Sequence, residues 1–168
     1  MSIDYSLHAA VSSSVEVVIQ DFASRMNLEQ ESAAGPGQYF RSGMTVHIGR
    51  DENHPPYAVE LLGLTSAVTV YFMPYDYVED QSADEYWQVF IDMISTSARF
   101  LDDADADGVL TREDEDIILQ RMNGRLTLNS RYGNWHVIKP EENLHVPFEW
   151  ASIPPLQEVA PGAEGEDA

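Results

Sequence analysis

The sequence has no cysteine among its 168 residues. Disulfides, thiolate nucleophiles and cysteine-based zinc sites are therefore excluded, and we expect a cytoplasmic protein. Long apolar runs are missing as well, so the chain offers no candidate membrane span. Its opening residues lack the basic and apolar regions of a secretory signal, which predicts a soluble protein without a leader.

The common catalytic motifs are also lacking. The sequence contains no GxSxG, Walker loop, GxGxxG or HExxH motif. The five histidines do not have the spacing of a metal site, and they are His8, His47, His54, His136 and His145. Adjacent carboxylates such as Glu115 and Asp116 would need desolvation to act as acid and base, whereas loop carboxylates are normally solvated. The sequence therefore predicts no catalytic residue and no enzyme.

Basic residues are scarce, with 9 against 29 acidic residues and a formal net charge of −20. Such a field repels nucleic acid and anionic membranes and attracts cationic protein surfaces. Alternatively, the acidity serves only solubility or reflects a saline habitat. Residues 79–116 hold thirteen acidic residues and only Arg99 and Arg112 as basic ones. We therefore expect one strongly negative face.

The apolar residues that are present, 43% of the chain, predict a folded domain with a substantial core. Helical spacing and capping boxes, Ser13 with Glu16 and Ser82 with Glu85, predict helices over residues 14–27 and 83–101. Alternating or continuous apolar runs predict strands at 3–9, 38–41, 44–48, 57–64 and 66–73, with a last short strand within 130–138.

This order of elements indicates the α+β class: one domain over residues 1–150, with a mainly antiparallel sheet and two helices packed on one face. Residues 151–168 are rich in proline, glycine and acidic residues and offer little to bury. That composition predicts an acidic disordered tail.

The stretch from Asp102 to Asn129 has two interpretations. In the first, residues 103–114 form an EF-hand-like calcium loop, in which glycine occupies the sixth position. The ligands would be Asp103, Asp105, Asp107, the Val109 carbonyl and Asp114. The terminal position holds aspartate where glutamate is usual, which favours weaker binding.

The second interpretation is a run of hairpins. Asn123-Gly124 separates two apolar segments, and both central residues of a type I′ turn need positive φ. An EF-hand requires a helix after its loop, whereas residues 117–122 have the pattern of a strand. We therefore predict a short strand at 109–111, a solvated turn at 113–116 and a hairpin around Asn123-Gly124, and calcium binding is the alternative.

Aromatic residues cluster on the loop that precedes the second long helix. Tyr75 and Tyr77 are flanked by the acidic residues Asp76, Glu79 and Asp80. Tyrosines surrounded by charge often anchor protein interfaces, so these five residues form a candidate partner-binding surface. The alternative is that the aromatic side chains pack in the core.

The opening MSIDYSL and the DGVL…DIILQRMNGRLTLN meander resemble the SitI-type immunity proteins. These are small proteins associated with toxin–immunity systems of myxobacterial outer-membrane exchange, with relatives in actinobacteria. The similarity covers about residues 1–150 in element order, and the family pattern lacks the full set of aspartates at 103–114. The family has no catalytic motif, and no binding residue is transferred from it.

The resemblance implies a compact acidic domain that binds and occludes a cognate, cationic toxin. Complementary fields speed the association of acidic inhibitors with basic partners, so the charge fits this role. The expected partner is a toxin protein, with no nucleic acid and no membrane, and the sequence leaves the oligomeric state open.

Overall fold

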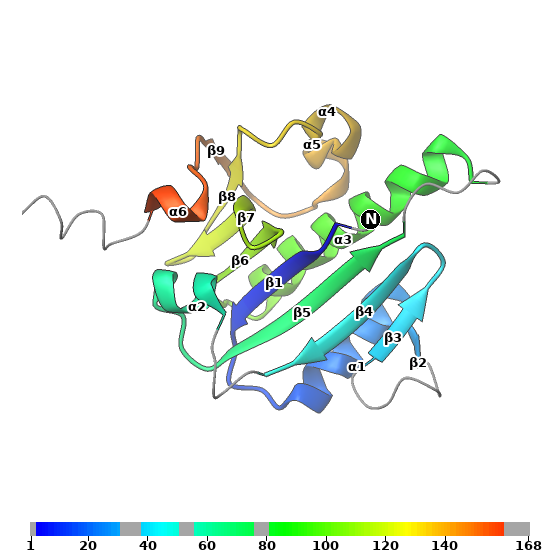
Figure 1. The fold of residues 1–168 in the computed structure, drawn as a ribbon, viewed down its shortest axis with the longest axis horizontal. Coiled ribbons are helices and arrows are strands. Elements are labelled where there is room, and N and C mark those ends of the chain that lie inside the picture. Colours follow the sequence, from blue (N-terminus) through cyan, green and yellow to red (C-terminus); the bar gives the residue numbers. More distant parts are fainter. Residues whose placement is uncertain (1–2, 31–37, 51–55, 76–80, 160–168) are drawn as a thin grey trace, which may run out of the picture.

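The computed structural model describes residues 3–30, 38–50, 56–75 and 81–159, which form a single sheet with helices on both of its faces (Figure 1). The strands lie in the order β2-β3-β4-β5-β1-β6-β7-β8-β9. Their bounds are Tyr5–Ala10 (β1), Glu29–Gln30 (β2), Gln38–Arg41 (β3), Met44–Gly49 (β4), Ala67–Pro74 (β5), Gly108–Arg112 (β6), Asp116–Met122 (β7), Arg125–Asn129 (β8) and Glu149–Ala151 (β9). Every neighbouring pair is antiparallel except β8 with β9. The predicted α+β class is confirmed.

The central strand is β1, which pairs with β5 on one side and β6 on the other. Leu7 lies opposite Val70 of β5 and Leu110 of β6, and all three are fully buried. The intervening positions Ser6 and His8 are also buried, on the other side of the sheet. Because both faces of β1 are covered, this strand connects two hydrophobic clusters.

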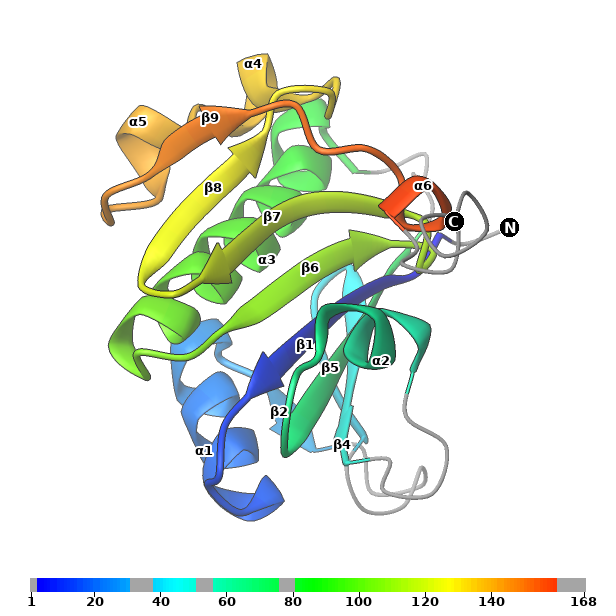
Figure 2. The same cartoon turned by 90° about the vertical axis from the view of Figure 1, so that its left-hand side faces the viewer.

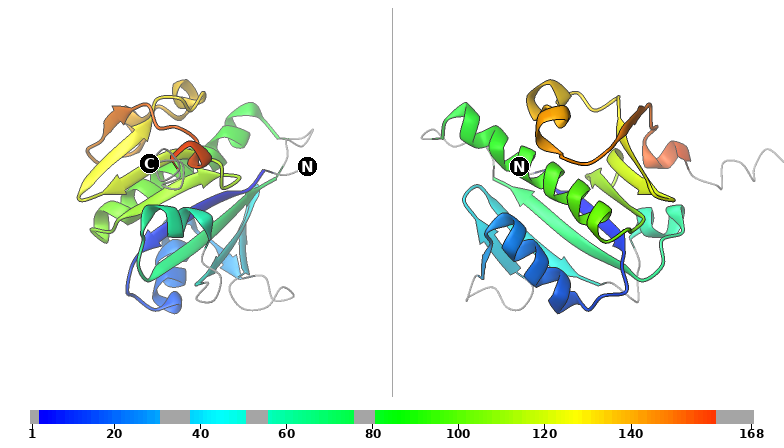
Figure 3. Two further views of the ribbon diagram at one scale, coloured as in Figure 1. Left: turned by 60° about the vertical axis from the view of Figure 1, so that its left-hand side comes forward. Right: turned by 180° about the vertical axis from the view of Figure 1, so that it is seen from behind.

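The main cluster lies under the two long helices, α1 (Val15–Met26) and α3 (Ala83–Asp103), which cover the same face of the sheet (Figure 3, right). Ser14 and Ser82 cap their N-termini by accepting hydrogen bonds from Val17 and Glu85 backbone amides. Phe22 of α1 packs between Phe72 of β5 and Phe100 of α3. Both predicted helices, and their placement on one face, are therefore confirmed.

The opposite face carries a smaller cluster beneath α2 (Tyr57–Leu62) and α6 (Leu156–Val159). Figure 2 shows these two helices on that face of the sheet. The prediction of a strand at 57–64 was wrong. Ala58 and Val59 are buried along one side of a helix that follows Pro56 and ends at Gly63, whose φ is +66°. A short apolar run does not distinguish a buried strand from a buried helix, and the proline and glycine at its ends decided for the helix.

The C-terminal part also differs from prediction. Residues 130–138 contain no strand; instead the chain forms two short helices, α4 (Trp135–Ile138) and α5 (Pro140–Asn143). The disordered tail was wrong for residues 151–159, because β9 extends the sheet and Ile153 and Leu156 are buried in the smaller cluster. Residues 160–168 lie outside the described part of the chain. Within that part, no helix combines the length and apolar character needed to cross a membrane.

Candidate functional site

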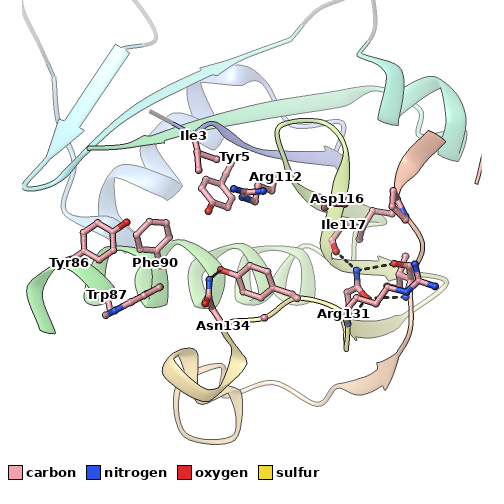
Figure 4. Close-up of a pocket in the computed structure, with 15 residues that line it drawn as sticks. Ile3, Tyr5, Tyr86, Trp87, Phe90, Arg112, Asp116, Ile117, Arg131 and Asn134 are labelled. Atoms are coloured by element: carbon pink, nitrogen blue, oxygen red, sulfur yellow. Dashed lines mark hydrogen bonds between the residues drawn. The ribbon is translucent and has the colours of Figure 1, made fainter. Parts of the chain in front are cut away.

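A cavity of about 410 Å³ lies where the start of β1, the first half of α3 and the chain after β8 meet (Figure 4). Its walls include Tyr5, Tyr86, Trp87, Phe90, Arg112, Asn129, Arg131 and Tyr132. We call it the arginine pocket, after Arg112. Its size falls within the range of sites that bind small molecules or one or two side chains.

One wall of the arginine pocket is formed by aromatic side chains that helical spacing places on the same side of α3. Tyr86 and Trp87 lie on one turn of α3 and Phe90 on the next, with ring centroids 5.2 to 5.5 Å apart. Phe90 also contacts Tyr5 of β1 edge to face, at 5.8 Å. The packing of helix against strand therefore fixes a rigid apolar surface at the base of the cavity.

Arg112, the last residue of β6, lies beside the Tyr5 ring in Figure 4. Burial raises the pKa of the Tyr5 hydroxyl to about 12, and a hydrogen bond with Arg112 opposes part of that increase. Burial also raises the pKa of Tyr132, and the Arg112 charge again opposes it. The guanidinium is thus close to two neutral phenols, and among the described residues no carboxylate lies within 4.0 Å of it.

Asn129, at the end of β8, forms hydrogen bonds with several of the segments that line the arginine pocket. Its side-chain amide donates to the carbonyls of Ile117 and Ile153, and its oxygen accepts from the amides of Arg131 and Ile153. The Trp135 indole donates to the Asn129 carbonyl at 2.7 Å. A buried asparagine with these partners is fully satisfied, so it anchors the C-terminal segment that closes one side of the cavity.

A row of aromatic rings continues from the pocket to the edge of the sheet. Tyr132 contacts Trp135, which contacts Trp150 on β9, which contacts Phe148, with centroids 5.2 to 5.7 Å apart. Trp150 is 46% exposed. The pocket therefore opens beside an exposed aromatic strip on an edge strand, a combination typical of protein interfaces.

The predicted hairpins are confirmed in the region of the candidate calcium loop. The strand after Gly108, the turn at 113–115 and the β7–β8 hairpin are all present, and Asn123 and Gly124 have φ of +54° and +81°. The helix that an EF-hand needs on the exit side is replaced by β6 and β7. Backbone pairing places Val109 opposite His8 on one side and Gln120 on the other.

The carboxylates of the aspartate loop (residues 103–108) have separate partners. Asp103 accepts from Arg25 of α1, Asp105 from Arg121 of β7, and Asp107 from the Asn123 amide, each at 2.8 Å. Arg121 is buried and also donates to the Ala106 carbonyl. These contacts join the loop to three other elements, so the aspartates stabilise the fold here.

Asp114 belongs to a different network, which includes the buried His8 of β1. Its carboxylate lies 3.4 Å from His8 Nε2 and accepts from the Thr111 hydroxyl, while His8 Nδ1 lies 2.9 Å from Thr69 Oγ1. The hydrogen bond with His8 lowers the pKa of Asp114. In the part of the chain that the structure describes, no three His, Asp or Glu side chains are grouped so as to hold a metal ion.

Of the candidate partner-binding residues, only Tyr75 is described. Its side chain is half exposed, and its hydroxyl lies 3.0 Å from Thr45 Oγ1 on β4. Asp76, Tyr77, Glu79 and Asp80 lie outside the described residues. This surface remains a prediction.

Sequence reasoning missed the arginine pocket because its residues come from five separate segments. One signal was present: Arg112 stands out as one of two basic residues in the acidic stretch 79–116. The sequence does not predict that Arg112 lies near Tyr5 and Tyr132, because these residues come together only in the fold.

Comparison with known proteins gives one match. The model of the SitI3-like family matches residues 3–138, which is most of the chain and includes β1 to β8 and both long helices. No curated protein and no solved structure matches. The protein belongs to the SitI3-like family, as the resemblance to SitI-type immunity proteins predicted.

Proposed function

We propose that this chain is a non-catalytic, cytoplasmic immunity protein that binds and neutralises a cognate toxin. The observation that carries the proposal is membership of the SitI3-like family over residues 3–138. An immunity protein acts by occlusion, which requires a stable surface and no reaction chemistry. The continuous sheet with its two cores supplies a rigid scaffold for such a surface.

The toxin surface that this protein recognises is cationic. Support comes from the net charge of −20 and from exposed acidic residues at the start of α3, where Asp84 and Glu85 lie next to the aromatic wall of the arginine pocket. Within the described residues neither has a salt-bridge partner. Free surface charge of one sign raises association rates with an oppositely charged partner.

Co-expression tests this proposal. Cells that produce the toxin-like protein encoded beside this gene should survive when this chain is also produced and die when it is not. A second arm uses Gly108→Ala, which we expect to lower the stability of the fold and therefore to protect less well. Equal killing with and without the native chain, for every neighbouring candidate, would refute the immunity function.

A further inference from the structure

In the arginine pocket of this acidic protein, Arg112 has no carboxylate partner within the part of the chain that the structure describes, and it is surrounded by aromatic side chains. Among the described residues, Arg25, Arg41, Arg121, Arg125 and Arg131 each have a carboxylate within 4.0 Å. In the same residue set, Arg50 and Arg99 lack one but donate to backbone carbonyls. Arg112 also lacks one there, although the chain has 29 acidic residues. Instead, its guanidinium lies beside the Tyr5 ring (Figure 4), and Tyr132 lines the same cavity.

From this arrangement we infer that the pocket binds a carboxylate carried on an aromatic or branched apolar group. Arg112 donates to the carboxylate, and the rings of Tyr86, Trp87 and Phe90 contact the apolar group. Arginine suits this role because its planar guanidinium donates two parallel hydrogen bonds to a carboxylate. The inference goes beyond the proposed function, and only the toxin as a source of the carboxylate rests on it.

The shape of the site restricts the ligand. A cavity of about 410 Å³ admits one aromatic amino acid or a chain end, and excludes a folded surface. Asp116, which lies opposite Arg112 in the β6–β7 pairing, and Asn134 also line the cavity. The Asp116 carboxylate repels a second negative charge, and the Asn134 amide donates or accepts hydrogen bonds. A monoanion with an apolar body therefore fits better than a polyphosphate.

The chemistry leaves two sources for such a group. One is a free small organic acid, and the other is a carboxylate-bearing side chain or chain end of the toxin. The exposed aromatic strip through Trp135 and Trp150 leads away from the pocket, so a peptide seated there has a surface along which to continue.

The probe is N-acetyl-L-phenylalanine, titrated into the ¹⁵N-labelled protein, with N-acetyl-L-phenylalaninamide as the uncharged control. We expect saturable shifts of the Trp87 indole and Arg112 Nε signals, and binding of the acid at least about tenfold tighter than binding of the amide. Equal affinities, or no saturable shifts at these groups, would overturn the inference.

Two variants that remove the same charge localise the effect. Arg112→Gln should abolish the preference for the acid. Arg125→Gln, at an exposed ion pair with Glu149 outside the pocket, should retain it. If the two variants behave alike, the preference arises from overall charge and the pocket assignment fails.

A third arm distinguishes the sources of the carboxylate. If the toxin supplies it, Arg112→Gln weakens the complex with the toxin about tenfold or more, and the probe competes with the toxin for the native protein. If the ligand is a free acid, Arg112→Gln leaves the affinity for the toxin unchanged and abolishes only the binding of the probe.

Discussion

The two ends of α3 lead to different conclusions about binding. The sequence near one end resembles a binding site, and the structure near the other end forms a pocket that the sequence does not indicate. Its C-terminal end leads into the aspartate loop, where a row of carboxylates resembles a binding site, yet each carboxylate has its own partner within the fold. Its N-terminal half lines the arginine pocket, where no motif is visible in the sequence and Arg112 has no carboxylate partner among the described residues. Charged groups that are satisfied internally stabilise a structure, and those left unpaired are the ones available to a ligand.

The first prediction tests why the aspartate loop contains glycine. In an EF-hand the glycine serves a sharp turn. In this fold, a Cβ at Gly108 would lie 2.7 Å from the His8 carbonyl oxygen and 2.5 Å from Leu101 Cδ2. Gly108→Ala should therefore lower the free energy of unfolding by about 3 kcal/mol, since the neighbouring β1 backbone must move. Urea denaturation measures the loss.

The matched control is Gly133→Ala, because a Cβ there meets no atom within 4 Å and the backbone does not have a positive φ. Its unfolding midpoint should be close to that of the native protein. If Gly108→Ala is equally harmless, the close packing of β6 against β1 is not what requires glycine.

The second prediction concerns Arg121, which ties Asp105 and the Ala106 carbonyl to β7. Arg121→Met removes both hydrogen bonds and leaves a buried carbonyl unpaired, so we expect a loss of about 1–2 kcal/mol in thermal or chemical unfolding. Arg125→Met removes an exposed pair on the next strand and should leave the unfolding midpoint nearly unchanged. The opposite order would show that the aspartate loop is not held by Arg121.

The third prediction tests the contact between Arg112 and Tyr5 through the pH at which the Tyr5 hydroxyl ionises. The folded pKa of Tyr5 is about 12, above its ordinary value of 10.0, so the folded state holds this proton more tightly. The resulting stabilisation is complete below pH 10 and is lost as the pH rises toward 12. Ultraviolet titration should show a late phenolate step that Tyr5→Phe removes.

Because the Arg112 contact lowers that pKa, Arg112→Gln should shift the late step to still higher pH. Arg125→Gln is the control of equal charge and should not shift it. A late step that is unaffected by Arg112→Gln would place the guanidinium away from Tyr5.

The smallest expected effect is that of calcium. Each carboxylate of the aspartate loop has a separate partner, and Val109 lies within a paired strand. An ion would have to break these contacts, so millimolar calcium should not shift the melting temperature. A rise in melting temperature with calcium, absent in Asp105→Asn, would show that the loop rearranges into an ion site.

Local signals predicted much of the fold correctly. Ser82 and the apolar spacing of α3 gave its position, and Asn123-Gly124 gave the β7–β8 hairpin, since capping and positive φ act within a few residues. The segment 57–64 failed because an apolar run of that length suits either a strand or a helix. Residues 151–159 failed because Ile153 and Leu156 become buried only when the smaller cluster exists.

The candidate site was less predictable for a related reason. The aspartate spacing was visible, but the arginines that neutralise it are distant in sequence: Arg25 lies on α1 and Arg121 on β7. Likewise, Arg112 and Tyr5 become neighbours only because β1 and β6 pair, which places them opposite one another. A local sequence pattern cannot predict that β1 pairs with β6, because more than a hundred residues separate Tyr5 from Arg112.

The central claim, that this acidic protein captures a cationic toxin, is tested most directly by the association rate measured by stopped flow at increasing ionic strength. We predict a rate that falls steeply with salt, since screening weakens long-range attraction. The variant Asp84→Asn/Glu85→Gln should associate more slowly than Glu16→Gln/Glu60→Gln, which removes two exposed charges from the first turns of α1 and α2. A rate that is independent of salt and equal in both variants would contradict the account.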